Sequence, residues 1–266
     1  MQRQLGSRCR TLCCRNVGSS VEADRTIAAA FFDLDKTIIS RSSALAFWPS
    51  FYKHGLISRG EAVRTAVAQL VFMLAGADHR RMERLRTQVA NLCRGWDAER
   101  VSDIVLRHLN ETILPLVYAE ARRLIAAHFS AGQDVIIVST SGLELVGPIG
   151  DLLGASEVIA TRMRVADGCY TGEMEFWAYG EAKALRMKEL AGARGYRLED
   201  CYAYSDSVTD LPMLETVGHP RAVNPDRALR RIARERDWPV LDFSGPSPRA
   251  EQVPQLRACE QADQLR

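Results

Sequence analysis

The sequence predicts an α/β protein in which a Rossmann-like parallel sheet is interrupted by an all-helical insertion. Three observations predict this fold. Residues 28–32 are apolar without alternation over the length of one strand, which is typical of a central strand buried on both faces. An amphipathic helix over 116–131, a glycine turn and the apolar stretch 134–139 form the helix-to-strand step of an alternating α/β chain. Residues 43–110 show helical periodicity and no convincing strand.

The predicted organisation has a main domain, an insertion and two tails. Residues 27–42 and 113–243 form the α/β domain, and residues 43–112 form the helical insertion. The polar segments 1–26 and 244–266 are expected to be tails without a packed structure. Because the insertion follows the first strand directly, we expect it to lie over the end of that strand as a cap.

The individual elements follow from the spacing of the apolar residues. Within the insertion, four apolar blocks separated by glycine-containing breaks predict four helices, over 44–51, 62–74, 82–92 and 101–109. In the main domain the pattern predicts, in chain order, a helix from Leu143, a strand over 157–160, a hairpin over 162–176 around an Asp167-Gly168 turn, a helix over 181–193, a strand over 201–205, a strand over 221–223, a helix over 225–236 and a strand over 239–243.

Composition limits the kind of protein this can be. The chain has 266 residues with 47% hydrophobic and 26% charged side chains, which is ordinary for a folded domain. A net charge of +2, with arginines mixed among acids, gives no basic field of the kind that marks a nucleic-acid binder. No stretch reaches the roughly 20 apolar residues of a membrane span. Seven cysteines without repeated spacing predict free thiols and a cytoplasmic location, and nothing indicates an oligomeric state.

Two carboxylates follow the first strand. Asp33 and Asp35 come directly after Phe32, at the edge of the sheet where open α/β proteins bind ligands. Residues i and i+2 of a strand point to the same face, so the two carboxylates would crowd together unless the backbone turns sharply or a cation lies between them. The alternative is a surface loop in which both are solvated turn residues.

Further polar groups lie at the ends or starts of other predicted elements, and their order along the chain is informative. Ser139 ends the strand over 134–139, Lys183 lies just inside a helix, and Asp206 and Asp210 follow the strand over 201–205. With the motif Asp33-Leu34-Asp35-Lys36-Thr37, these groups resemble the haloacid dehalogenase superfamily of phosphohydrolases, in its phosphoserine phosphatase-like branch, subfamily IB, with a helical cap. The resemblance covers about residues 28–243.

The resemblance implies a mechanism and a metal. Asp33 would attack phosphorus and become an aspartyl-phosphate, while Asp35 would protonate the leaving alkoxide and later deprotonate water. Lys183 would stabilise Asp33 and its phosphoryl group. Mg²⁺ would be held by Asp33, the backbone carbonyl of Asp35, and Asp206, and Asp210 would orient a metal-bound water or Lys183.

The resemblance also implies a phosphate-binding group. Hydroxyls and backbone N–H groups at the start of a helix suit phosphate oxygens. The candidate residues are Thr37, Ser139, Thr140, Ser141 and Gly142. Taken singly, several of these features have local alternatives, because 139–141 and 207–210 could simply cap helices and Lys183 could be a solvated helix lysine.

The resemblance to phosphoserine phosphatases is incomplete. Those enzymes carry a glutamate shortly after the first motif, and this chain has Ser40-Arg41-Ser42-Ser43 there. The sequence therefore predicts a phosphatase acting on a phosphorylated small molecule, with phosphoserine in doubt. Two alternatives stay open: a non-catalytic regulator that binds a phosphorylated ligand on the same fold, and a phosphotransferase that passes its phosphoryl group to a sugar.

Overall fold

The computed structural model describes residues 28–57 and 79–245. The predictions of an N-terminal tail, of the helix over 62–74 and of most of the C-terminal tail fall outside these residues. Within them, no helix is both long and apolar enough to cross a membrane.

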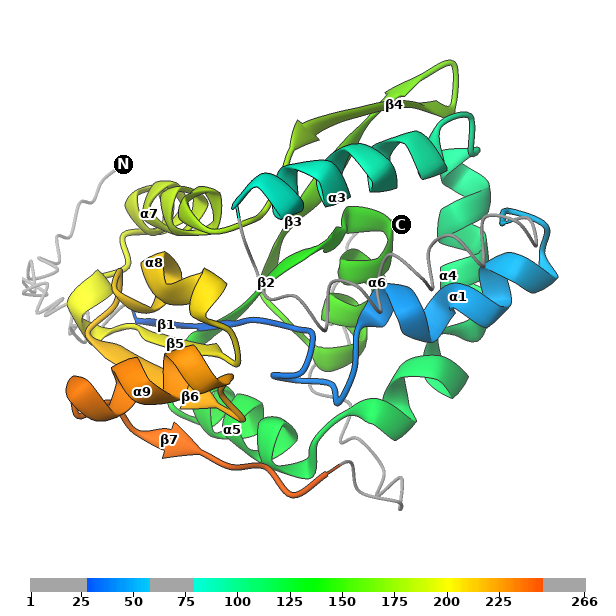
Figure 1. The fold of residues 1–266 in the computed structure, drawn as a ribbon. Coiled ribbons are helices and arrows are strands. Elements are labelled where there is room, and N and C mark those ends of the chain that lie inside the picture. The colour runs from blue at the N-terminus through cyan, green and yellow to red at the C-terminus, as the bar shows by residue number, and fades with distance from the viewer. Residues whose placement is uncertain (1–27, 58–78, 246–266) are drawn as a thin grey trace, which may run out of the picture.

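The described chain forms the predicted sheet (Figure 1). Seven strands lie in the order β4-β3-β2-β1-β5-β6-β7, and all neighbours are parallel except the antiparallel pair β3 and β4. The first strand, β1, is central, with Ala30 paired with Val135 of β2 and with Tyr202 of β5. The strand bounds are β1 Ala29–Phe32, β2 Asp134–Gly142, β3 Glu157–Ala166, β4 Cys169–Phe176, β5 Tyr202–Ser205, β6 His219–Val223 and β7 Val240–Leu241.

Helices cover both faces of this sheet. One face packs against α5 and α6, in a core that includes Phe32, Ile125 and Val146. The other packs against α7, α8 and α9, in a core that includes Phe31 and Met187. Their bounds are α5 Ala119–Ser130, α6 Leu143–Leu153, α7 Glu181–Arg194, α8 Leu211–Leu214 and α9 Arg227–Glu235, with short 3-10 turns η1 Leu114–Leu116, η2 Leu198–Asp200 and η3 Val208–Asp210.

The described part of the insertion contains the helices α1 Ser43–Lys53, α3 His79–Cys93 and α4 Ala98–Ile113, as the periodicity predicts. Helix α1 packs on α4, α4 packs on α6, and α3 lies along strand β4 (Figure 1). Phe47 and Val105 belong to the same apolar core as the α5–α6 face of the sheet. The insertion thus shares its core with the main domain, and its separate role as a cap stays a prediction.

Several boundaries differ from the predicted ones. The helix expected from 116 begins at Ala119, because Pro115 lies in the turn η1 and Val117 is extended. Strand β2 continues through an irregular register to Gly142 instead of ending at Ser139. The short strand expected over 157–160 and the first arm of the hairpin are one strand, β3.

The hairpin turn itself is where the sequence places it. Asp167 and Gly168 have φ angles of 49° and 77°. Two successive positive φ values are the requirement of a type I′ turn, and Asp-Gly is a favoured pair for it. The hairpin prediction is therefore confirmed.

Candidate active site

Asp33 lies at the centre of the sheet edge. It follows β1 immediately, and its backbone N–H donates to the carbonyl of Tyr204 at 2.9 Å, which continues the pairing with β5 by one residue. Its side chain is almost fully buried, with 6% of the residue exposed. The alternative of a solvated turn residue is therefore wrong for Asp33.

Lys183 joins Asp33 to Asp210. Its Nζ lies 2.8 Å from Asp33 Oδ1 and 2.9 Å from Asp210 Oδ2, and Ser205 Oγ also donates to Asp210 Oδ2 at 2.8 Å. Burial by itself lowers the pKa of Lys183, but the charges of Asp210 and Asp33 reverse this effect, so the pKa is raised and the ammonium is kept. Lys183 is 1% exposed, which rules out a solvated helix lysine.

Asp35 is held by a turn of the backbone. Lys36, the next residue, has φ 64°, a left-handed conformation that bends the chain away from the strand direction. Asp35 Oδ1 accepts from the backbone N–H of Ser43 at 2.8 Å, and Oδ2 accepts from Ser141 Oγ at 3.1 Å. Burial raises the pKa of Asp35, while these hydrogen bonds from Ser43 and Ser141 oppose the rise. The two carboxylates therefore have different partners, Ser43 and Ser141 for Asp35 and Lys183 for Asp33.

The carboxylates repel one another electrostatically. Burial raises the pKa of Asp33 well above its usual range against the effect of Lys183, and Asp210, Asp206 and Asp35 add to the rise. Burial likewise raises the pKa of Asp206 to about 7, with Lys36 opposing and Asp210 adding. The cluster therefore carries more negative charge than its lysines neutralise.

The donor set fits Mg²⁺. A hard ion of this kind takes carboxylate and carbonyl oxygens together with several waters, and a positive charge beside Asp33 and Asp206 would relieve their repulsion. In residues 28–57 and 79–245, no group of three His, Cys, Asp or Glu side chains is placed to hold a metal. The set predicted from the sequence has two carboxylates and the carbonyl of Asp35, so it does not require such a group.

The predicted phosphate-binding residues are brought together only in part. Ser139 is buried, and its Oγ accepts from the backbone N–H of Ser141 at 3.2 Å. Ser141 reaches Asp35, as described above, and Gly142 directly precedes α6. The Thr140 hydroxyl instead donates to the carbonyl of Ala178 at 2.8 Å, because the irregular end of β2 turns this side chain toward the segment after β4. The group of Thr140 expected to bind phosphate is its backbone N–H, so that role stays a prediction.

Thr37, the last residue of the motif that begins at Asp33, is buried. It is 1% exposed, and its hydroxyl has no hydrogen-bond partner among the described residues.

Asp210 also has its side chain turned into the protein. Ser207 Oγ caps the η3 turn by accepting from Thr209 N, whereas the Asp210 carboxylate accepts hydrogen bonds from Lys183 and Ser205. The alternative that residues 207–210 only cap a helix is therefore wrong for Asp210.

Two residues that hold the site were not predicted. Ser43 donates its backbone N–H to Asp35 and its hydroxyl to Ser141 Oγ at 2.9 Å. Ser205 supports Asp210. Ser205 ends an apolar strand just before Asp206, a position like that of Ser139, so the sequence carried a signal for it. Ser43 carried none, because its contact depends on the turn at Lys36.

Comparison with known sequences identifies the family. Residues 30–215 match the sequence model of the haloacid dehalogenase-like hydrolases, and the chain belongs to this family. It is 58% identical to the "Inhibition of morphological differentiation protein" of Streptomyces azureus, over 85% of this chain and 82% of that protein. It is 55% identical to a probable phosphatase of Mycobacterium tuberculosis, over 87% and 81% of the two chains. More distant relatives, each 32% identical, are a phosphoserine phosphatase of M. tuberculosis and a histidinol-phosphatase of Neisseria meningitidis.

Solved structures agree on the fold. A protein of unknown function from Bordetella pertussis superposes with a TM-score of 0.72 at 27% identity, covering 82% of this chain and 99% of that one. A phosphoserine phosphatase with a phospho-aspartyl intermediate analogue gives a TM-score of 0.60 at 20% identity, over 84% and 95% of the chains. The predicted family, fold class and enzyme type, a hydrolase of this family with relatives named as phosphatases, are confirmed.

Proposed function

We propose that the protein is a Mg²⁺-dependent phosphomonoester hydrolase that acts on a phosphorylated small molecule through an aspartyl-phosphate. The observation that carries the proposal is the buried Lys183 ammonium, within 2.9 Å of both Asp33 and Asp210 at the end of the central strand. A carboxylate fixed beside a full positive charge is a nucleophile placed where charge develops during phosphoryl transfer. The relative named as a probable phosphatase supports the same reaction.

The first half-reaction uses Asp33 and Asp35. A carboxylate oxygen of Asp33 forms a bond to phosphorus as the bond from phosphorus to the ester oxygen breaks. The leaving alkoxide takes a proton from Asp35, whose raised pKa lets it carry one. Lys183 offsets the charge on Asp33 and the phosphoryl oxygens.

The second half-reaction restores the enzyme. Asp35, now ionised, takes a proton from water, and the water oxygen bonds to phosphorus as the acyl-phosphate bond to Asp33 breaks. Inorganic phosphate and the free Asp33 carboxylate result. Hydrogen bonds from Ser43 and Ser141 favour the ionised form of Asp35 that this step needs. When bound by Asp33, Asp206 and the carbonyl of Asp35, Mg²⁺ would neutralise phosphoryl charge.

The phosphate would be bound beside α6. Ser139 Oγ, the Ser141 N–H and Gly142 lie at the junction of β2 and α6, where the positive end of the helix dipole favours an anion. The hydroxyl of Thr37, which has no partner in the part of the chain that the structure describes, is a further donor for a phosphate oxygen. A phosphate in this position would replace the internal hydrogen bond from Ser141 to Ser139.

Phosphate release from a panel of phosphomonoesters with Mg²⁺ tests the proposal. Asp33→Asn keeps the size of the side chain and removes the nucleophile, so turnover should fall to background. Release from no ester, or release undiminished in this variant, would overturn the hydrolase and favour a binding protein. Release that appears only when an acceptor alcohol is supplied would mean a phosphotransferase.

A further inference from the structure

A short segment between β4 and α7 lies against the site on two sides. Thr140 Oγ1 donates to the carbonyl of Ala178 at 2.8 Å, and the Ala178 N–H donates to Thr161 Oγ1 at 3.2 Å. Gly180, two residues on, directly precedes helix α7, which carries Lys183. Residues 177–180 are thus fixed between the C-terminal end of β2 and helix α7, which carries Lys183.

Two aromatic rings of this segment form a stack. The Trp177 and Tyr179 ring centroids are 4.7 Å apart with an angle of 13° between the planes. The Tyr179 N–H donates to the Trp177 carbonyl at 2.9 Å, so a tight turn holds both rings on one side of the chain. Both residues are half-buried, whereas the aromatic residues of β1 are at most 1% exposed. The stack therefore has aromatic surface outside the core.

Tyr179 adjoins the start of helix α7: its carbonyl accepts from the N–H of Ala182, the residue before Lys183, at 3.1 Å. Burial raises the pKa of Tyr179, the charge of Asp210 adds to the rise, and Lys183 opposes it. The phenol therefore stays protonated and uncharged beside the ion pair. No described residue forms a hydrogen bond with its hydroxyl.

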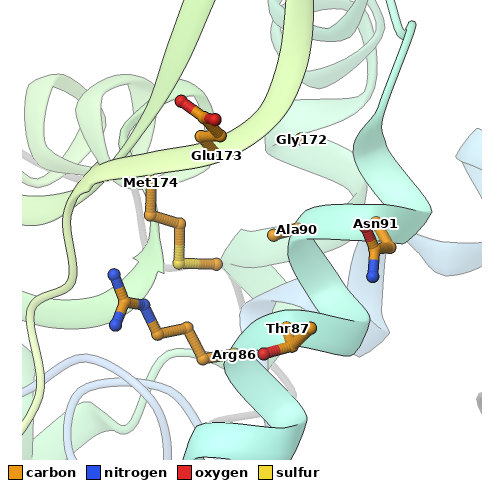
Figure 2. Close-up of a pocket in the computed structure, with 7 residues that line it drawn as sticks. All are labelled: Arg86, Thr87, Ala90, Asn91, Gly172, Glu173 and Met174. Atoms are coloured by element: carbon orange, nitrogen blue, oxygen red, sulfur yellow. The ribbon is translucent and has the colours of Figure 1, made fainter.

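The stack continues toward helix α3. The Arg86 guanidinium carbon lies 5.6 Å from the centroid of the Trp177 ring, in cation–π geometry. Arg86 also lines an open hollow of about 390 Å³ between α3 and β4. Figure 2 shows Arg86 and Met174 reaching into the space between helix and strand, while Glu173 points away from the helix, where it pairs with Arg164.

We propose that the Trp177–Tyr179 stack, covered on one side by Arg86, binds the leaving group of the substrate. This inference rests on the proposed function and names its substrate class: phosphomonoesters of alcohols that carry a planar, unsaturated ring. Offset stacking on an aromatic surface discriminates a flat ring from a puckered one of similar size. The position between Thr140 and Lys183 places such a ring next to a phosphoryl group on Asp33.

A matched pair of phosphonates tests this subsite without requiring turnover. 2-Phenylethylphosphonate and 2-cyclohexylethylphosphonate have the same reach and similar apolar size, and differ in whether the ring is flat. Calorimetric titration with Mg²⁺ present should show the phenyl compound binding more tightly, by about 2- to 12-fold. Trp177→Leu and Tyr179→Leu should remove this preference, while Tyr179→Phe should keep it.

Trp238→Leu is the control variant. Trp238 also lies under an arginine, Arg236, whose guanidinium carbon is 5.0 Å from its ring, but it follows helix α9, away from the site. This variant should keep the phenyl preference. Equal affinities in the wild type, or a preference that survives in both leucine variants of the stack, would overturn the subsite. Selective binding without any turnover of phosphomonoesters would instead overturn the hydrolase function and leave the ring-binding site standing.

Discussion

Replacing Lys183 by methionine should destabilise the protein strongly. The methionine keeps most of the side-chain length and removes the ammonium from between two carboxylates. Lys183, Asp33 and Asp210 have side chains that are 2%, 8% and 4% exposed, so water cannot take over the solvation. Breaking a buried ion pair from one side typically costs about 3–5 kcal/mol, because the remaining charge is left without its partner. For a domain of this size, that loss lowers the unfolding temperature by about 6–20 °C.

Lys188→Met provides a matched control on the same helix. Lys188 is exposed on α7, so its replacement should change the free energy of unfolding by at most about 0.5 kcal/mol. Both variants and the wild type would be unfolded in urea at pH 7 without metal, followed by circular dichroism. Phosphomonoester turnover, measured in parallel, should fall by about 10²–10³-fold in Lys183→Met only.

The pH dependence separates this electrostatic loss from a packing defect. Without Lys183, the folded-state pKa of Asp33 should rise further above its unfolded value. A carboxyl with a raised folded pKa destabilises the protein in full above that pKa, and the cost diminishes as the pH falls from the folded toward the unfolded pKa. The deficit of Lys183→Met should therefore shrink toward pH 5. A deficit below about 1 kcal/mol at pH 7, or one that does not change with pH, would refute the buried ion-pair arrangement.

Three further predictions test the metal, the acid and the packing. Without metal at pH 8, Asp206→Asn should stabilise the protein by up to about 4 kcal/mol, because the wild-type carboxyl, with its pKa raised from 3.8 to about 7, ionises unfavourably; in urea titrations the gain should shrink as the pH falls below 7 and vanish only below about pH 4, where the carboxyl of the unfolded chain is protonated as well. Mg²⁺ at 100 times its dissociation constant should raise wild-type stability by about 2.7 kcal/mol and that of this variant far less. Asp35→Asn should slow hydrolysis of alkyl phosphates by about 10²–10⁴-fold, and that of p-nitrophenyl phosphate less, since this leaving group needs no proton; equal losses in steady-state assays would argue against a general acid. Gly218→Ala should cost about 1–3 kcal/mol, since a Cβ there would lie 1.8 Å from the Glu199 carbonyl, while Gly147→Ala, with open space around it, should be neutral or stabilising in thermal unfolding.

The sequence predicted that several candidate groups would gather at one sheet edge because these groups follow strands. Asp33, Ser139 and Asp206 each come at or just after the end of an apolar run, and parallel strands bring such ends to one sheet edge. Lys183 was identified by its place near the start of a helix in that order. The structure brings Lys183, Asp33 and Asp210 into direct contact.

Other features depend on geometry that local pattern does not encode. The hydroxyl of Thr140 contacts the carbonyl of Ala178 at the irregular end of β2, a contact that the sequence did not predict. Ser43 meets Asp35 only because Lys36 adopts a left-handed conformation. The contact of Arg86 with Trp177 joins residues from the insertion and the main domain, which no periodicity within either segment predicts.

The presence of a lysine at position 183, in a chain rich in arginine, fits the arrangement of the two carboxylates around it. Only four of the 35 basic residues are lysines, and one of them is Lys183. An ammonium is compact and can approach carboxylates from two directions, as it does with Asp33 and Asp210 at 2.8 and 2.9 Å. A guanidinium is a wider planar fork whose geometry matches a single carboxylate in a bidentate pair. The single ammonium leaves the other carboxylates in excess. That excess is expected to lower the stability of the metal-free protein, and the same negative charge would attract a divalent cation next to Asp33, the proposed nucleophile.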